Sequence, residues 1–449
     1  MKICIQGLGF VGSAMSVAAS LSKNKVVGIE QPTQEGKKII ESINKGIFPF
    51  KTNDKALKKN LKILSKKNFL KASYLKSHYE DADVVIVSIN CDLKKKNNKQ
   101  KINLDIFKKA IKQFAVRIKE ETLVIIESTV PPGTCKEIIY PLIYNSFIKR
   151  KLDPERFYLA HSYERVMPGK FYLNSIINNW RVYSGINNIS AKKCKNFFKK
   201  IINTKKYPLY QLKNTTHSEF GKLLENSYRA VNIALIDEWS VLADKLKLDL
   251  FSIINSIKVR PTHKNLMNPG FGVGGYCLTK DPLIGNIGAK QIYGINQKLP
   301  LSNLAVKINN NMPQRTIEKL KNHFNKNLKN KKILLLGVSY KEDVADSRFS
   351  PSNFFYKKMI SFGVKITPHD PLVKYWIEFK KKISNKIPDL SKFDAIIFTV
   401  KHKEYKKIKF KKIKKNKNFL IVDANNVLSE KQTKDIKSKK FNFISIGRS

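Results

Sequence analysis

The chain has 449 residues, 42% of them hydrophobic, and a formal net charge of +51. This length is enough for two or three domains, and no uninterrupted apolar run approaches a membrane span, which argues against membrane insertion. The five cysteines are widely scattered and form no CxxC pair or Cys/His cluster. We therefore expect no metal site and a reducing, cytoplasmic compartment.

The large positive charge is typical of proteins that bind nucleic acid or anionic membranes. Here, however, the lysines are spread along the whole chain, for example in 94–101, 405–417 and 434–440, and they are not interleaved with aromatic residues in one binding module. We therefore predict no nucleic-acid partner. The charge would still attract a doubly charged nucleotide substrate.

The N-terminus has the pattern of a dinucleotide-binding unit. A strand predicted at 2–6 leads into Gly7, Gly9 and Gly12 in Gly-x-Gly-x-x-Gly spacing, and a helical pattern follows. In such a loop the first glycine permits a tight turn, the second lets a pyrophosphate approach the backbone, and the third allows close helix–strand packing.

A second strand at 25–30 ends in an acid, Glu30, about where a ribose-binding carboxylate belongs. An acid rather than an arginine here favours NAD over NADP. A signal peptide is the rival interpretation of the N-terminus. The polar Gln6, the spaced glycines and the immediate second strand argue against it.

The rest of the first part alternates strands with helices. Further strands are predicted at 84–89, 122–128, 158–163 and 181–184, and helical patterns lie between most of them, including one at about 105–119. This alternation predicts βαβ organisation with a parallel sheet. The basic segment 94–101 is predicted to be a polar loop.

The pattern then changes to helix. Apolar residues at helical spacing predict a long helix over 217–246 and more helix to about 257. After a glycine-rich loop, a further helical stretch is predicted over 283–325, with Pro313 marking a kink or break. Such a helical middle can serve as a connector and as a subunit interface.

The last part is again strand-rich. Strands are predicted at 332–337, 364–370, 395–400, 419–423 and 443–447, without a second Gly-x-Gly-x-x-Gly. The fold class is therefore predicted to be α/β, with two doubly wound Rossmann-like domains joined by a central helical segment. The predicted boundaries are 1–205, 206–325 and 326–449.

The glycine-rich loop at 268–282 presents one cysteine. Cys277 follows the last glycine of the loop by two positions, and Lys280 and Asp281 come three and four positions after the cysteine. Glycines let the backbone come close to a ligand, and a cysteine beside a cation can have a lowered pKa and act as a nucleophile. A flexible loop with an incidental buried cysteine is the alternative.

Taken together, six ordered motifs resemble the UDP-glucose/GDP-mannose dehydrogenase family of NAD-dependent nucleotide-sugar dehydrogenases. The motifs span nearly the whole chain, at 7–12, 127–134, 164–169, 222–232, 268–281 and 337–351. The resemblance implies oxidation of the C6 hydroxyl of a nucleotide-linked hexose to a carboxylate, with two NAD and one water, for surface polysaccharide precursors. It also implies that Cys277 captures the intermediate aldehyde as a thiohemiacetal, which becomes a thioester and is hydrolysed.

The resemblance implies five more catalytic residues. Lys222 would stabilise the developing oxyanion, Asn226 would hold the same oxygen or a water, and Asp281 would orient or activate water. Glu164 would be the base for hydrolysis, and Thr129 would hydrogen-bond a water near the nicotinamide. From their spacing alone, Lys222 and Asn226 would share a solvated helix face.

The resemblance also implies binding residues. For NAD these are Gly7, Gly9, Phe10, Val11, Gly12, Glu30, Ser128, Thr129 and Lys280. For the UDP-sugar they are Glu164, Arg165, Lys222, Asn226, Arg260, Gly274, Tyr340 and Lys341. Arg260 would reach the substrate of a neighbouring subunit, so a homodimer is expected.

The identity of the sugar stays open, as UDP-glucose or a UDP-N-acetylhexosamine. The segments 164–169 and 272–277 look like the N-acetylhexosamine branch, whereas Lys280 resembles the glucose and GDP-mannose branches. The turn at 89–92, and Asn425 or Asn426 in place of a usual arginine, depart from the family pattern. The alternatives are a GDP-mannose 6-dehydrogenase, a two-electron hydroxyacid dehydrogenase of related fold, and a basic nucleic-acid-binding protein.

Overall fold

The computed structural model describes residues 1–96, 99–410, 413 and 418–448; residues 97–98 of the predicted polar loop and part of the lysine run 405–417 lie outside the described residues. The chain forms two compact units, Met1–Glu225 with Leu283–Leu299, and Asn226–Pro282 with Pro300 onward. None of the helices in the described ranges is both long and apolar enough to cross a membrane.

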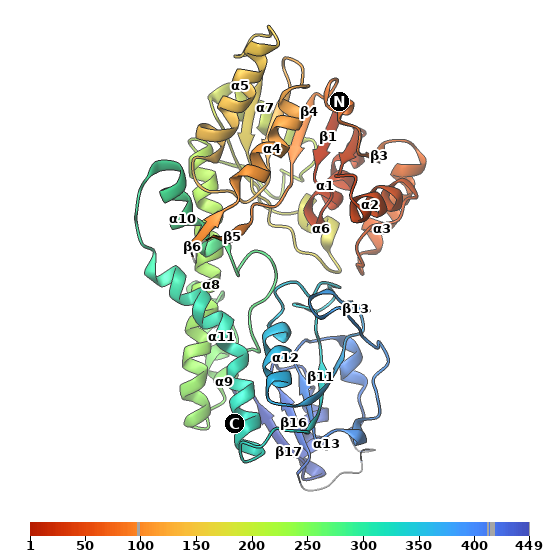
Figure 1. Ribbon diagram of the computed structural model, residues 1–449, viewed down its shortest axis with the longest axis vertical. Coiled ribbons are helices and arrows are strands. Elements are labelled where there is room, and N and C mark those ends of the chain that lie inside the picture. The colour runs from red at the N-terminus through yellow and green to blue at the C-terminus, as the bar shows by residue number, and fades with distance from the viewer. Residues whose placement is uncertain (97–98, 411–412, 414–417, 449) are drawn as a thin grey trace. The chain divides into compact units, whose positions relative to one another are not determined.

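The first unit is built on an eight-stranded sheet in the order β10-β9-β8-β7-β4-β1-β2-β3 (Figure 1). Only β8 and β9 pair antiparallel; the other neighbours are parallel. The strands are β1 Lys2–Gln6, β2 Lys25–Ile29, β3 Leu70–Ser73, β4 Val84–Val87, β7 Leu123–Ile126, β8 Tyr158–His161, β9 Val182–Gly185 and β10 Tyr210–Gln211. The six predicted strands are present, and the edge strands β3 and β10 are additional.

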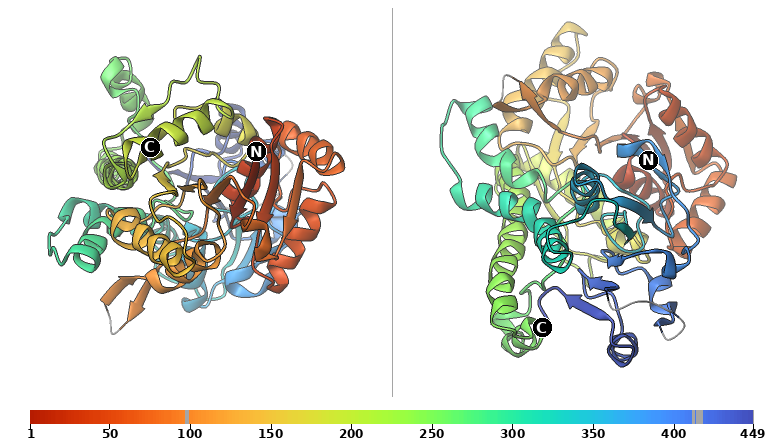
Figure 2. Two further views of the ribbon diagram at one scale, coloured as in Figure 1. Left: turned by 90° about the horizontal axis from the view of Figure 1, so that it is seen from above. Right: turned by 60° about the horizontal axis from the view of Figure 1, so that its bottom comes forward.

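Helices cover both faces of this sheet (Figure 2). Ile3 and Ile5 of β1 pack in one apolar cluster, and Cys4 between them packs in another on the opposite face. The first cluster includes residues of α1 Phe10–Leu21, α2 Gln34–Asn44, α3 Lys55–Lys66, α6 Tyr172–Ile177 and α7 Asn188–Lys199. The second includes residues of α4 Leu104–Ala115 and α5 Tyr140–Lys149. Burial on both faces explains why β4 and β7 are uninterrupted apolar runs.

The predicted polar loop at 94–101 is instead part of a β-hairpin. Strands β5 Leu93–Lys96 and β6 Lys99–Ile102 pair antiparallel, with Leu93 opposite Ile102. Ile102 is buried, and its backbone N–H and C=O are both bonded by the side-chain amide of Gln291, at 2.7 and 3.2 Å. The prediction of a loop was wrong because the two apolar residues that pair in the hairpin, Leu93 and Ile102, flank the lysine-rich run and lie outside it.

The long central helix is present as α8, Thr215–Lys245, and α9 Leu250–Ile257 follows it. The stretch predicted over 283–325 is two helices, α10 Asp281–Tyr293 and α11 Pro300–His323. The break lies at Gly294, whose φ of 72° ends α10, and not at Pro313, which lies inside α11. Pro313 is buried and its ring faces Gly272, so packing keeps it within the helix.

The C-terminal part of the second unit is a five-stranded parallel sheet in the order β12-β11-β15-β16-β17. Its strands are β11 Lys332–Leu336, β12 Lys365–His369, β15 Ala395–Phe398, β16 Leu420–Asp423 and β17 Asn442–Ser445, and its helices are α12 Pro351–Ser361 and α13 Glu430–Ser438. A short ladder, β13 Tyr375–Trp376 with β14 Lys381–Lys382, lies apart from it. Residues of β11 alternate between two apolar clusters, so this sheet too is buried on both faces, as predicted.

The segment after β17 joins this sheet to the helices of the same unit. The backbone N–H of Gly447 donates to Asp244 of α8 at 3.1 Å, and its carbonyl accepts from Leu250 of α9 at 3.0 Å. A Cβ at Gly447 would lie 2.7 Å from the ring of Pro269. The end of the sheet therefore packs against the start of the cysteine loop.

Candidate active site

Each sheet has one point at which the strand order reverses. In the first sheet it lies between β1 and β4, and in the second between β11 and β15. Ligands of doubly wound folds bind outside the carboxyl ends of the strands at such a point. The loops after β1 and β11 carry the predicted residues Gly7–Gly12 and Tyr340–Lys341, respectively.

The glycine loop after β1 packs tightly against the protein at Gly7 and Gly12 and leaves open space beside Gly9. Gly7 has φ +89°, and a Cβ at Gly12 would lie 1.9 Å from the carbonyl oxygen of Gly7. A Cβ at Gly9 would meet nothing within 4 Å. Glu30 accepts a hydrogen bond from the N–H of Leu8 at 2.7 Å, which holds the carboxylate beside the loop. This cradle fits the pyrophosphate and ribose of a dinucleotide.

Phe10 and Val11 begin α1 and are half-buried. The ring of Phe10 stacks on Phe50 with centroids 4.2 Å apart, and its carbonyl accepts from the hydroxyl of Tyr172 at 2.5 Å. Both contacts fix the first turn of the helix whose N-terminal N–H groups face the glycine loop.

The turn after β7 is the second part of the cofactor side. Ser128 accepts a hydrogen bond from the N–H of Ile89 at 3.1 Å, which ties the ends of β4 and β7 together, and Thr129 beside it is half-buried. Further along, Gly133 and Cys135 donate their backbone N–H groups to the carboxylate of Glu219 on α8. Glu219 is not among the predicted site residues, although its position three residues before Lys222 places both on neighbouring parts of one helix face.

Lys222 is buried and is directed at the predicted substrate segment. Its Nζ donates to the backbone carbonyl of Glu164 at 2.7 Å and lies 3.8 Å from the carboxylate of the same residue. Its ammonium group also lies 5.5 Å from the ring centroid of Tyr163. The interpretation of Lys222 and Asn226 as a solvated helix face is therefore wrong, since both side chains are buried.

Arg165 is held by α8 as well. Its guanidinium forms a forked contact with Glu225, with distances of 2.9 and 3.2 Å, and donates to the carbonyl of Trp180 at 3.2 Å. Behind this segment, His161 of β8 hydrogen-bonds Ser218 of α8 at 2.7 Å. Burial lowers the pKa of His161 to about 3, so its imidazole is neutral.

Cys277 lies at the start of a helical turn in the second unit. Its side chain is exposed, and its carbonyl accepts hydrogen bonds from the N–H groups of Lys280 at 3.2 Å and Asp281 at 2.9 Å. The hydroxyl of Thr279 donates to the carbonyl of Gly275 at 2.9 Å. These bonds fold residues 275–281 into a compact turn that opens directly into α10.

A buried polar cluster lies at the end of that turn. Both oxygens of Asp281, which is fully buried, are engaged: Oδ1 pairs with Lys280 Nζ at 2.8 Å, and Oδ2 accepts from Asn226 Nδ2 at 2.7 Å. The Lys280 ammonium also lies 4.4 Å from the ring centroid of Tyr276. The cluster thus brings together three of the predicted residues, and two of them, Lys280 and Asp281, follow the exposed thiol by three and four positions.

The glycines of the cysteine loop give close access to the C-terminal domain. Cβ atoms at Gly274 and Gly275 would lie 2.7 and 2.9 Å from Tyr340, and burial raises the pKa of this tyrosine to about 12. A Cβ at Gly270 would lie 2.8 Å from the side-chain oxygen of Asn425. Asn425, one of the two asparagines predicted to replace the usual arginine, therefore packs directly on the loop.

Arg260 and Lys341 are both exposed. Arg260 precedes the short 3-10 helix η3, Pro261–His263. Asn232 of α8 holds the segment before the cysteine loop, donating to the carbonyl of Asn265 at 2.9 Å and accepting from the N–H of Met267 at 3.0 Å.

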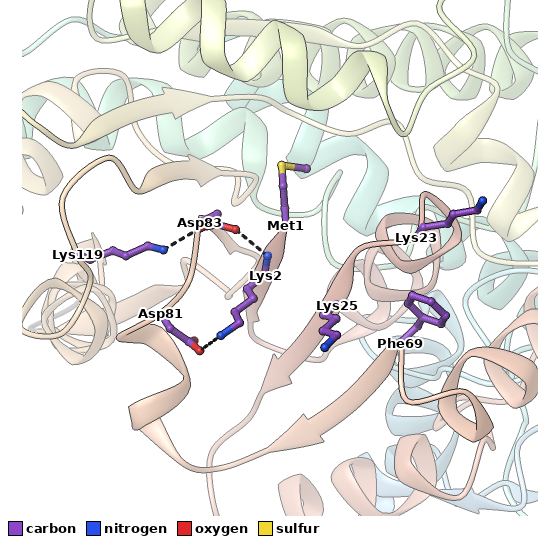
Figure 3. A pocket seen from close by; sticks show the side chains of 8 residues that line it. All are labelled: Met1, Lys2, Lys23, Lys25, Phe69, Asp81, Asp83 and Lys119. Atoms are coloured by element: carbon purple, nitrogen blue, oxygen red, sulfur yellow. Dashed lines mark hydrogen bonds and ion pairs between the residues drawn. The ribbon is translucent and has the colours of Figure 1, made fainter.

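A surface hollow lies at the opposite edge of the first sheet, where the strands begin (Figure 3). Lys2 pairs with Asp81, its backbone N–H donates to Asp83 at 2.9 Å, and Lys119 pairs with Asp83 at 2.8 Å. Because ligands of parallel sheets bind at the carboxyl ends of the strands, this hollow is a solvated ion-pair cluster.

Comparison with known proteins decides the family. Three models of the UDP-glucose/GDP-mannose dehydrogenase family match in order: the NAD binding domain at residues 1–202, the central domain at 216–311 and the UDP binding domain at 334–430. The chain belongs to the UDP-glucose/GDP-mannose dehydrogenase family. It is thus an NAD-dependent nucleotide-sugar dehydrogenase, and the predictions of the family, the α/β fold, NAD and a UDP-sugar ligand are confirmed.

Members of the family with similar chains include the UDP-N-acetyl-D-mannosamine dehydrogenase of Methanocaldococcus jannaschii, which is 30% identical over 95% of this chain and 93% of its own. The solved UDP-D-ManNAc dehydrogenase of Pyrococcus horikoshii matches with a TM-score of 0.84 and 27% identity, covering 100% of this chain and 99% of the other. A UDP-glucose dehydrogenase from Pyrobaculum islandicum has a TM-score of 0.83 at 18% identity over 100% and 98% of the two chains, which shows the shared fold.

Proposed function

We propose that this dehydrogenase oxidises UDP-N-acetyl-D-mannosamine at C6 to the uronic acid, in four electrons, through a covalent intermediate on Cys277. The observation that carries the mechanism is the exposed thiol of Cys277 one helical turn before the buried Asp281, whose two oxygens are held by Lys280 and Asn226. The substrate rests on the relatives from Methanocaldococcus and Pyrococcus, which bear that activity in their names.

The glycine loop and Glu30 would hold NAD, which would supply the hydride acceptor for the two oxidations at the sugar C6. Between the two oxidations, the sulfur of Cys277 loses its proton and forms a bond to the aldehyde carbon, and the carbonyl oxygen takes up that proton and becomes the hydroxyl of a thiohemiacetal. Lys222 is suited to this oxygen because its ammonium is buried and already directed at the carbonyl of Glu164. A buried cation stabilises a developing oxyanion far better than one in water.

The thioester that follows is hydrolysed by water. Water adds to the carbonyl carbon and one of its protons passes to the carboxylate of Glu164. The C–S bond then breaks, the sulfur of Cys277 takes that proton from Glu164, and the uronic acid is released. Asp281 and Asn226 orient this water, and Thr129 acts from the cofactor side. Arg165, Arg260, Gly274, Tyr340 and Lys341 bind the nucleotide sugar, as the family resemblance implies.

We further propose a cytoplasmic homodimer with the domain boundaries predicted above. In the second unit, exposed apolar side chains recur along α8 and at the residue directly after it, at spacings of seven, four, three and four residues: Tyr228, Leu235, Trp239, Leu242 and Leu246. A contiguous apolar stripe of this kind is typical of a protein interface. The exposed Arg260 is available to a neighbouring subunit, and the five cysteines form no disulfide in the part of the chain that the structure describes.

The test is the yield of NADH per sugar, measured by absorbance, over UDP-N-acetylmannosamine, UDP-N-acetylglucosamine, UDP-glucose and GDP-mannose. We expect the highest kcat/KM with UDP-N-acetylmannosamine and about two NADH per molecule oxidised. A higher kcat/KM with UDP-glucose or GDP-mannose would overturn the proposed substrate assignment. A yield of one NADH per sugar would point to a two-electron alcohol dehydrogenase.

Cys277→Ala is expected to abolish the second oxidation. Cys194→Ala is the matched control, because Cys194 is buried in the core between α7 and the sheet. Loss of turnover in the control, or full turnover in Cys277→Ala, would contradict the covalent mechanism.

A further inference from the structure

Glu219 is a fully buried carboxylate that the proposed chemistry does not use. It lies on α8, and its oxygens accept the backbone N–H groups of Gly133 at 2.6 Å and Cys135 at 2.8 Å. Those two residues belong to the turn that leads from Thr129 into the π-helical segment η2, Thr134–Ile139. The first N–H groups of such a segment have no partner within it, so the carboxylate supplies the acceptors.

The same turn is confined on its other side by α10. Gly133 has φ +90°, and a Cβ there would lie 2.0 Å from the hydroxyl of Tyr293. A Cβ at Gly288 would lie 2.4 Å from Pro131. The turn therefore packs closely against α10 on one side and is hydrogen-bonded to Glu219 of α8 through Gly133 and Cys135.

We propose that Glu219 is a positioning residue, which holds the turn 131–135 and thereby keeps Thr129 in register with Lys222. This inference rests on the proposed function, in which Thr129 and Lys222 act together. Lys222 follows Glu219 by three residues on one helix, so the two share a face. Two consecutive prolines, at 131 and 132, transmit the position of the turn to Thr129 because their φ angles are fixed.

A carboxylate is needed for this role because it can accept from both N–H groups at once. A glutamine side chain has one acceptor oxygen, and its NH₂ group would face the other N–H. Removing an acceptor from a buried donor is costly, and bonds to a charged acceptor are the stronger ones. The geometry thus predicts that glutamate and glutamine at position 219, which have nearly equal shape, hold the turn differently.

The same reasoning makes the turn sensitive to pH. Burial raises the pKa of Glu219 to about 7, and protonation converts one of its oxygens into a donor. The other titratable groups around the turn are the thiol of Cys135, the hydroxyl of Tyr293, and Glu137 and Lys136. Burial raises the pKa values of Cys135 and Tyr293, so both stay neutral near pH 7.

The test compares kcat of wild type and Glu219→Gln with the UDP-sugar, at pH 8 and at pH 6. At pH 8 we expect wild type to be about 10-fold faster, the effect of one charge-assisted hydrogen bond. At pH 6, where wild-type Glu219 is protonated, the ratio should fall toward one. Glu137 is an exposed acid in the same segment, so the control variant Glu137→Gln should have the kcat of wild type at both pH 8 and pH 6.

A second readout does not depend on turnover. Hydrogen exchange of the amides in 133–139, corrected for intrinsic rates, should be faster in Glu219→Gln at pH 8 and faster in wild type at pH 6 than at pH 8. The positioning role would be overturned if amide exchange in 133–139 were equal in wild type and Glu219→Gln, and if the ratio of their kcat values did not change with pH. A wild-type enzyme that oxidises no UDP-sugar would instead overturn the proposed function, and the exchange data would still test Glu219.

Discussion

The pair formed by Lys280 and Asp281 allows a prediction of stability that is separate from activity. Asp281→Asn keeps the shape of the side chain but removes its charge. The side chains of Lys280 and Asp281 are 9% and 0% exposed, so the substitution leaves a buried ammonium group without its counter-ion. Breaking a buried pair from one side costs about 3–5 kcal/mol of unfolding free energy. Tyr276, 4.4 Å away, remains as a cation–π partner, so we expect a cost of about 3 kcal/mol.

The assay is urea unfolding followed by tryptophan fluorescence, since Trp239 and Trp376 lie in the same unit as the pair. The double variant Lys280→Met/Asp281→Asn removes the uncompensated charge, and we expect it to regain at least half of the lost stability. Its activity should stay low, because Asp281 is then still missing. A loss of less than about 1 kcal/mol in Asp281→Asn would refute the reasoning, since it would place the pair among solvent-screened ones.

Three further predictions concern the glycine loop, a buried histidine and the apolar stripe. Gly12→Ala should weaken NAD binding more than 10-fold and lower the free energy of unfolding by about 1–3 kcal/mol, because its Cβ would lie 1.9 Å from a backbone oxygen. Gly9→Ala should leave the free energy of unfolding within about 0.5 kcal/mol of wild type, because a Cβ there would meet nothing within 4 Å. His161 is neutral in the fold to about pH 3 but titrates normally when unfolded, so stability should fall as the pH drops below about 6.5, and with a shallower slope in His161→Gln. Trp239→Glu should convert a dimer into a monomer by light scattering while the helix content by circular dichroism stays unchanged; a dimer in this variant would exclude the stripe as the interface.

The sheets could be predicted from the sequence because each central strand is buried on both faces. Runs such as 84–87 and 123–126 are apolar without interruption, which no exposed segment would be. The hairpin at 93–102 could not be predicted in this way, because Ile102 is fixed by Gln291, a residue far along the chain. Likewise, Pro313 is buried beside Gly272 inside α11, and the sequence does not show that contact.

The candidate site was predicted in part. The family resemblance predicts catalytic roles for Cys277, Lys222 and Asn226 from their motifs, but it did not indicate that the last two are buried. Glu219 could not be predicted because its partners are backbone N–H groups on a turn far away in the sequence. A sequence pattern does not show which backbone groups need an acceptor. Helix spacing relative to Lys222 was the only signal available.

The bonds of Gly447 to Asp244 and Leu250 also set an order of assembly during synthesis. The first unit needs no residue beyond Leu299, whereas the second draws its early helices, its cysteine loop and its last strand from both ends of the remaining chain. At about 5–20 residues per second, the ribosome needs on the order of 10–30 s to pass from Pro282 to Gly447. For that interval α8 and α9 have emerged without the segment after β17 that hydrogen-bonds to Asp244 and Leu250, so these helices complete their packing only after Gly447 has been made.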